Sequence, residues 1–253
     1  MIILAWLLVL LYYFYQYALR SAPSVMIPQL SDAFSLSAVG IASIIGLFYY
    51  GYSPFALIAG ASLDRLGLRR VIPVGAITVG IGAILFATGN FTVASIGRFL
   101  QGAGGAVPIV GAIYIVSKYF PGSKAATYIG SAQMFGMAGG FAGQFAVGPL
   151  ISAGFPWRNF WIIMGIAGFA LGIILFFFLP KEPAKEKPEN FFRSTLGAFK
   201  LVLKNPQSIL CGLIAALIFI PTNVWDMVWG VRFLQEGHGL DYGSAVLRAA
   251  AVP

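Results

Sequence analysis

The sequence predicts an all-α, polytopic membrane protein, built from a six-helix transmembrane bundle, a linker and one further transmembrane helix. Of the 253 residues, 59% are hydrophobic and only 9% are charged, whereas about 25% of the residues in ordinary soluble domains are charged. A soluble fold of this size cannot cover so much apolar surface. Charge-free runs of roughly 20 residues, the length that crosses a bilayer core, also follow one another. These features exclude a soluble enzyme, a disordered chain and a disulfide-stabilised scaffold.

Seven apolar runs are long enough to form transmembrane helices, and turn residues set their limits. Gly89-Asn90 separates the third helix from the fourth, and Gly154-Phe155-Pro156 separates the fifth from the sixth, because Gly, Asn and Pro favour turns. The predicted helices span residues 3–28, 38–63, 70–88, 91–118, 124–152, 158–180 and 206–233, and residues 242–253 open an eighth. The predicted organisation is therefore a six-helix bundle at 1–180, a cytoplasmic linker at 181–205 and the start of a second bundle at 206–253.

The distribution of basic residues indicates which side of the membrane each loop faces. With a cytoplasmic N-terminus, eleven Lys and Arg residues fall on the cytoplasmic side, against three (Arg158, Arg232 and Arg248) on the other. The eleven are Arg65, Arg69, Arg70, Lys118, Lys124, Lys181, Lys185, Lys187, Arg193, Lys200 and Lys204. Membrane proteins keep Lys and Arg in cytoplasmic loops, so we expect this orientation. The same bias explains the net charge of +8 without a nucleic-acid partner.

Glycines four residues apart recur in the fifth and sixth predicted helices. Small residues at this spacing let two transmembrane helices approach closely. We therefore expect the fifth helix to pack tightly against a neighbour, and we interpret these glycines as packing residues. The pairs are Gly136/Gly140, Gly139/Gly143 and Gly168/Gly172.

The segment between the second and third predicted helices, GASLDRLGLRR at 60–70, places a carboxylate, glycines and arginines at a fixed spacing. A carboxylate at a helix C-terminus opposes the helix dipole, so this one is expected to bond a neighbouring helix or an arginine. The glycines would permit a tight turn and close packing, and the arginines would anchor the loop at an anionic membrane surface. A plain basic loop would explain the arginines but not the spacing. The motif residues are Gly60, Asp64, Arg65, Gly67, Arg69 and Arg70.

This segment resembles the loop between helices two and three of the major facilitator superfamily, and the resemblance covers the whole sequence. In the fourth predicted helix, RFLQGAGG at 98–105 is similar to the second motif of that family. The antiporter motif of the fifth helix is matched only in part, because Gln144 stands where a glycine is expected, although Gly148-Pro149 is present. That departure argues against antiport.

The resemblance implies a transporter of two six-helix bundles that rock about a central site and expose it alternately to each side. It places the 60–70 motif in the inner gate. Such proteins usually have twelve helices, so the resemblance implies a truncated chain that lacks its C-terminal half. Within the superfamily, RSAPSVM at 20–26 and YSP at 52–54 look similar to bacterial members labelled sugar-phosphate permeases. A fainter resemblance reaches the lysosomal dipeptide transporters.

Two arginines lie inside predicted spans, where a charged residue indicates a functional site. At ~1.5 Å per residue, Arg20 lies ~24 Å above the inner face and Arg98 ~10 Å below the outer face, so the two can share one cavity. Guanidinium groups bind carboxylates and phosphates bidentately, so the pair predicts an anionic substrate group. Two other roles remain open, snorkelling of Arg20 to the headgroups and interhelix hydrogen bonding by Arg98. Tyr49, Tyr50 and Tyr52 face either the path or the lipid.

Three further polar residues complete the predicted substrate site. Gln101 and Gln133 are candidate hydrogen-bonding residues, and Asp226 in the seventh span is a candidate counter-ion or proton carrier. No metal or cofactor is expected, because the single Cys211 and the single His238 offer no ligand spacing and no phosphate-binding loop is present.

The sequence therefore predicts a secondary active transporter that moves a small anionic or zwitterionic organic solute by alternating access, as a proton-coupled symporter or a uniporter. Its expected partners are the solute, protons, the lipid bilayer and the missing C-terminal half, and its expected location is the bacterial inner membrane. The alternative is a seven-helix receptor or regulatory remnant without transport activity. A membrane enzyme would need clustered acid, base or metal-binding groups, which this sequence does not offer.

Overall fold

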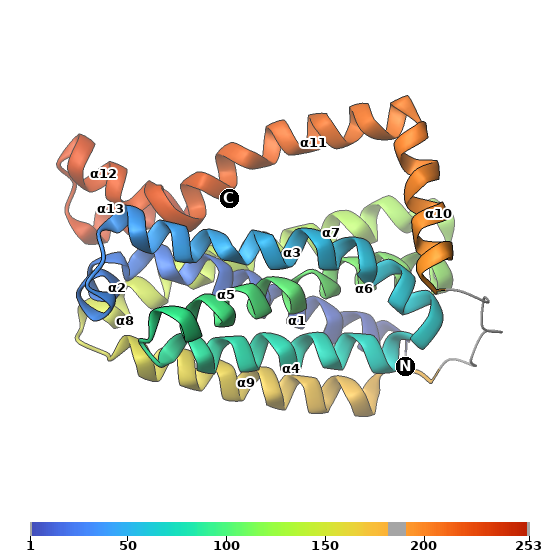
Figure 1. Ribbon diagram of the computed structural model, residues 1–253, viewed down its shortest axis with the longest axis horizontal. Coiled ribbons are helices and arrows are strands. Elements are labelled where there is room, and N and C mark those ends of the chain that lie inside the picture. Colours follow the sequence, from blue (N-terminus) through green and yellow to red (C-terminus); the bar gives the residue numbers. More distant parts are fainter. Residues whose placement is uncertain (1, 182–190, 252–253) are drawn as a thin grey trace.

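The computed structural model describes residues 2–181 and 191–251, and these residues form helices joined by short turns (Figure 1). Seven segments are long and apolar enough to cross a membrane. They are Ile2–Val25, Ala38–Leu66, Leu68–Ala87, Phe91–Tyr119, Gly122–Ser152, Trp157–Phe178 and Pro206–Val224. The predicted all-α fold is confirmed, and each of the seven predicted spans corresponds to one of these segments.

The six spans before the linker contain α1 (Ile2–Ser21), η1 (Ala22–Val25), α2 (Ile27–Phe34), α3 (Ala38–Leu66), α4 (Leu68–Ala87), α5 (Phe91–Gly105), α6 (Val107–Tyr119), η2 (Gly122–Lys124), α7 (Ala125–Phe145), α8 (Val147–Ser152) and α9 (Trp157–Phe178). The later elements are α10 (Phe191–Lys204), α11 (Pro206–Val224), the π-helical turn η3 (Trp225–Trp229), α12 (Gly230–His238) and α13 (Tyr242–Ala250). The turn at Gly67, between α3 and α4, lies at one end of the bundle (the Gly67 end), and the turn at Asn90, between α4 and α5, lies at the other (the Asn90 end).

Four of the predicted spans are interrupted, and in the first, fourth and fifth the interruption lies beside a proline. α1 gives way to η1 at Pro23, α5 gives way to α6 just before Pro108, and α7 gives way to α8 just before Pro149. Proline has no N–H and its ring collides with the carbonyl four residues earlier. Pro108 cannot donate to the carbonyl of Gly104, four residues earlier. That carbonyl instead accepts a 2.7 Å hydrogen bond from the Tyr12 hydroxyl.

The glycines of the fifth span lie directly against the first span, as expected. A Cβ atom at Gly139 would overlap the backbone of Phe14 in α1, and one at Gly143 would overlap the backbone of Ala18. In the sixth span, a Cβ atom at Gly168 would lie 2.8 Å from the Cα atom of Gly80 in α4. The predicted close helix approach is confirmed, and it fixes α1, which carries Arg20, against α7.

Alanine substitutions at two glycines of α7 are expected to have opposite effects. At Gly143 the new methyl group collides with the α1 backbone, and we expect a loss of about 1–3 kcal/mol of stability. At Gly130 a Cβ atom meets nothing within 4 Å, and alanine should be neutral or stabilising by up to about 1 kcal/mol. Thermal unfolding in detergent measures both variants. Equal effects would contradict the close packing of α7 against α1.

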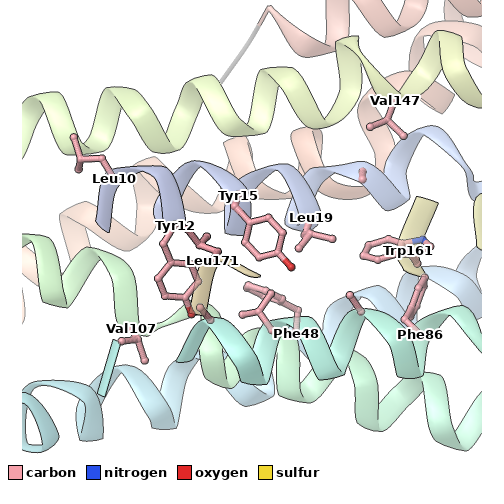
Figure 2. Packing of buried hydrophobic residues seen from close by; sticks show 14 of the residues in the cluster. Leu10, Tyr12, Tyr15, Leu19, Phe48, Phe86, Val107, Val147, Trp161 and Leu171 are labelled. Carbon is pink, nitrogen blue, oxygen red and sulfur yellow. The ribbon is translucent and has the colours of Figure 1, made fainter. Parts of the chain in front are cut away.

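Apolar side chains fill the space between α1, α3, α4 and α9. Figure 2 shows Tyr15, Leu19, Phe48 and Phe86 in this layer, together with Trp161 of α9. The rings of Phe86 and Trp161 lie 4.7 Å apart in an edge-on arrangement, which aromatic pairs favour. Any charged group in this region is therefore surrounded by hydrocarbon and rings instead of water.

α10 and α11 lie outside the six-span bundle (Figure 1). Residues 182–190 of the predicted linker lie outside the described residues, and Phe191–Lys204 form α10. No residue of α11 is classed as buried. At the Asn90 end, by contrast, the Tyr242 hydroxyl donates a 2.6 Å hydrogen bond to the carbonyl of Val25. α13 therefore joins the later elements to the bundle at that end.

Candidate functional site

Arg20 lies in the last turn of α1 and is enclosed by aromatic side chains. Its side chain is 3% exposed, and its Nη2 donates a 2.9 Å hydrogen bond to the hydroxyl of Tyr49 on α3. The guanidinium carbon lies 4.7 Å from the ring centre of Tyr17 and 5.9 Å from that of Phe219 on α11. Aromatic faces attract cations. This enclosure does not fit a side chain that snorkels to the headgroups.

Arg98 lies on α5 and is fully buried, with 0% exposure. Its Nη1 donates to the Gln101 Oε1 at 2.6 Å and to the carbonyl of Leu19 at 3.4 Å, and its Nη2 donates to the carbonyl of Ile45 at 3.5 Å. The Leu19 carbonyl is available because Pro23, four residues later, has no N–H. Arg98 therefore ties α5 to α1 and α3, as the interhelix role proposed from the sequence requires.

Among the side chains that the structure describes, the hydrogen-bond partners of Arg98 are all uncharged. Its Nε is buried without a hydrogen-bond partner, and the rings of Phe48 and Phe86 lie 5.4 Å and 5.7 Å from its guanidinium carbon. A buried charge is costly unless it is paired. A buried guanidinium in these surroundings therefore favours an anionic group nearby.

Phe48 on α3 brings the two arginines into one site. Its ring centre lies 5.8 Å from the guanidinium carbon of Arg20 and 5.4 Å from that of Arg98. Its side chain is 1% exposed, and Tyr52, one turn further along α3, stacks on it at 5.7 Å. Two guanidinium groups thus lie next to one ring in an apolar layer, an arrangement that suits an anionic group.

The other predicted substrate residues are distributed around this region. Gln101 is 1% exposed and holds Arg98 through its Oε1, while its Nε2 is buried without a partner. Gln133 on α7 accepts a 3.2 Å hydrogen bond from the hydroxyl of Tyr13 on α1. Asp226 belongs to the η3 turn, and its side chain lies outside the described residues. The structure therefore brings Gln101 to the arginine pair and places Gln133 on the neighbouring α1–α7 contact.

Sequence reasoning missed two residues of the site and a third residue one helical turn from it. Phe48 and Phe219 are single aromatic residues in apolar spans, and nothing in their sequence context distinguishes them from lipid-facing residues. Gln16 had a usable signal, because it is the only strongly polar residue in the apolar run before Arg20 and precedes it by four residues. That spacing places both side chains on one face of a helix.

The 60–70 motif forms the turn between α3 and α4 at the Gly67 end. Gly67 ends α3 with φ at +77° and donates its N–H to the Leu63 carbonyl at 3.0 Å, a backbone conformation that favours glycine. Asp64 and Arg65 are exposed. The guanidinium carbon of Arg69 lies 4.9 Å from the ring centre of Phe176 on α9. The predicted tight turn is present.

The close packing expected at Gly60 is not found among the described residues. A Cβ atom there would meet only Val110, at 3.9 Å, which is an ordinary contact. Arg70, the last residue of the motif, is exposed. Gly60 is thus loosely packed, whereas Gly139 and Gly143 of α7 are tightly covered.

No group of three His, Cys, Asp or Glu residues that could hold a metal ion occurs in the part of the chain that the structure describes. Cys211 is exposed on α11, and His238 is exposed at the end of α12, beside the ring of Phe233.

Known proteins match the chain over almost its whole length. The sequence profile of the Major Facilitator Superfamily covers residues 9–253. This chain belongs to the Major Facilitator Superfamily. The superfamily and the matched relatives are transporters, not enzymes, and the resemblance stated from the motifs is confirmed.

Two curated relatives are named as transporters, one of hexuronate and the other, as probable, of sulfoacetate. The hexuronate transporter of Bacillus subtilis (strain 168) is 30% identical over 234 residues, which are 89% of this chain and 54% of that protein. A probable sulfoacetate transporter of Cupriavidus necator is 24% identical over 178 residues, which are 69% of this chain and 41% of that protein. The chain thus spans about half the length of these relatives. The narrower resemblance to sugar-phosphate permeases stays a prediction.

Solved superfamily structures share the fold. An inward-facing, unoccupied crystal structure of a bacterial homolog to the human lysosomal transporter Spinster has a TM-score of 0.69 at 21% identity, and covers 99% of this chain and 59% of that chain. A D-xylose-proton symporter has a TM-score of 0.62 at 16% identity, and covers 98% of this chain and 64% of that chain. At these identities the likeness shows the fold alone.

Proposed function

We propose that this chain is the N-terminal part of a secondary transporter that moves small organic anions. One observation carries the proposal: Arg98 is completely buried, its hydrogen-bond partners among the described side chains are uncharged, and Arg20 shares the Phe48 ring with it. A substrate carboxylate or sulfonate would pair with this buried positive charge. The two curated relatives, named for hexuronate and sulfoacetate, support an organic acid over a neutral sugar.

In the proposed site, Arg20 is the direct ligand of the anion and Arg98 supplies a second positive charge behind the Phe48 ring. Arg20 lies between α1, α3 and α11, where the Phe219 ring faces it, so it is the arginine nearer the seventh span. Gln101 holds Arg98 in place through its 2.6 Å hydrogen bond. Gln133 and Asp226 complete the proposed set, with Asp226 as counter-ion or proton carrier.

The proposed mechanism is alternating access between this six-span bundle and a second bundle that the chain begins with α11–α13. Two contacts join the later elements to the bundle at the Asn90 end. The ring of Phe219 on α11 lies against the Arg20 guanidinium, and the hydroxyl of Tyr242 on α13 donates a hydrogen bond to the Val25 carbonyl. The 60–70 motif at the Gly67 end would belong to the inner gate. We propose that this end, with the N-terminus, faces the cytoplasm of a bacterial cell, because the basic loops collect there.

The coupling mode follows from where acidic residues occur. Between residues 2 and 178 the only carboxylates are Asp32 and Asp64, which lie on α2 and at the end of α3. Neither belongs to the arginine site. We propose that the transporter works either as a uniporter or as a proton symporter whose protonated group lies beyond the first six spans, with Asp226 as the candidate.

The test is transport by the complete protein, meaning this chain joined to its second bundle, in proteoliposomes loaded with unlabelled D-glucuronate. We expect saturable counterflow of labelled D-glucuronate that galacturonate and sulfoacetate inhibit and that D-glucose does not. An imposed pH gradient should drive accumulation only if a proton is cotransported. Counterflow that glucose inhibits as well as glucuronate does would refute the anion proposal.

A further inference from the structure

Gln16 is a buried amide that forms no hydrogen bond. Its side chain is 1% exposed, and both Oε1 and Nε2 lack a partner. An amide that is buried without partners is costly, and such groups are rare in native proteins. None of the functions argued above uses Gln16, so its position needs a separate explanation.

The position of Gln16 relates it to the arginine site. It precedes Arg20 by four residues on α1, so the two side chains leave the same face about 6 Å apart along the helix axis. Its amide lies against Gly105, where a Cβ atom would approach the Gln16 Cγ to 2.9 Å and its Nε2 to 3.1 Å. Gly105 is the last residue of α5, at the break before α6. Irregular backbone at membrane depth is tolerated where it is buried in protein or lines a cavity.

A second amide lies one helical turn away on the facing helix. Gln101 precedes Gly105 by four residues on α5; its Oε1 accepts from Arg98, and its Nε2 is also buried without a hydrogen-bond partner. Three amide atoms on the Gly67 side of the arginine pair thus have no hydrogen-bond partner, namely both polar atoms of Gln16 and the Nε2 of Gln101. An amide offers a donor and an acceptor, as a hydroxyl group does.

We propose that Gln16 and Gln101 form a second, uncharged subsite that binds hydroxyl groups of the substrate. This inference rests on the proposed function, in which Arg20 binds the carboxylate. The substrate would then be a hydroxylated acid bound along the bundle axis, with its carboxylate at Arg20 and its hydroxyl groups one helical turn towards the Gly67 end. An acid without hydroxyl groups leaves these amides unpaired and binds more weakly.

The test compares two ligands that share a six-membered ring and a carboxylate, D-glucuronate and cyclohexanecarboxylate, by calorimetric titration of the complete transporter. Wild type should bind D-glucuronate at least tenfold more tightly. The Gln16→Met variant should lose about 10- to 100-fold of its affinity for D-glucuronate and keep its affinity for cyclohexanecarboxylate within twofold. The matched control is Gln207→Met, at an exposed glutamine of α11, which should change neither affinity.

A second variant covers the case in which Gln16→Met does not fold. Gly105→Ala adds a methyl group against the Gln16 side chain and should produce the same ligand-selective loss while Gln16 is retained. Equal losses for both ligands, or no loss for either, would overturn the subsite and leave the anion proposal standing. If wild type binds neither ligand, the proposed function itself fails.

Discussion

Replacing Arg20 by methionine in the complete transporter is expected to weaken the binding of D-glucuronate by about 100-fold or more. Removing one partner of a desolvated charge pair costs about 2–5 kcal/mol, and Arg20 is 3% exposed within its aromatic enclosure. Arg20→Lys keeps the charge but loses the planar fork that grips a carboxylate, so we expect an intermediate loss. Calorimetric titration of purified protein measures the affinities.

The matched control is Arg158→Met, which changes the net charge equally at an exposed arginine at the Asn90 end. It should leave the affinity for D-glucuronate unchanged. If Arg20→Met bound the anion as tightly as wild type, Arg20 would be a packing residue and the proposed carboxylate ligand would be lost.

Replacing Arg98 by glutamine is expected to abolish measurable anion binding, whereas Arg98→Lys should retain affinity to within about tenfold. Arg98 acts in our proposal through its charge, because it lies fully buried behind Phe48, and lysine preserves that charge. Charges interact strongly in surroundings from which water is excluded. Direct titration of both variants, with thermal unfolding to confirm folding, provides the measurement.

Comparing the variants Arg98→Gln and Arg98→Lys separates an electrostatic role of Arg98 from a structural one. A purely structural role would depend on the hydrogen bonds to the carbonyls of Leu19 and Ile45, which neither lysine nor glutamine can reproduce with the geometry of a guanidinium. Under that role the two variants would be equally impaired. Equal loss of binding, with an equal fall in unfolding temperature, would therefore contradict the electrostatic account.

The helical architecture could be predicted because it depends on length and composition. A run of roughly 20 apolar residues can satisfy its backbone in a bilayer only as a helix, so seven spans follow from the sequence. The breaks at Pro23 and Pro108 could have been located in the same way, but what satisfies the freed carbonyls depends on neighbouring helices. Tyr12 and Arg98 perform that role from distant positions in the chain.

The candidate site was predictable where charge lies inside an apolar span, which identified Arg20 and Arg98. The aromatic enclosure was not, because Phe48 and Phe219 differ from lipid-facing phenylalanines only in tertiary position. At Gly60 the sequence predicted a close contact that the described part of the chain does not form, because a glycine at packing spacing does not indicate which helix approaches it. In this chain a Cβ atom at Gly60 meets only Val110.

The most direct measurement compares the affinities of the complete transporter for D-glucuronate and for D-glucuronamide, its neutral amide of nearly the same shape. If the arginine pair binds a substrate carboxylate, the amide should bind about 100-fold more weakly or worse, because charge-assisted hydrogen bonds are roughly twice as strong as neutral ones and the site would keep an unpaired charge. Equal affinity for the acid and its amide would show that the two arginines do not select an anion.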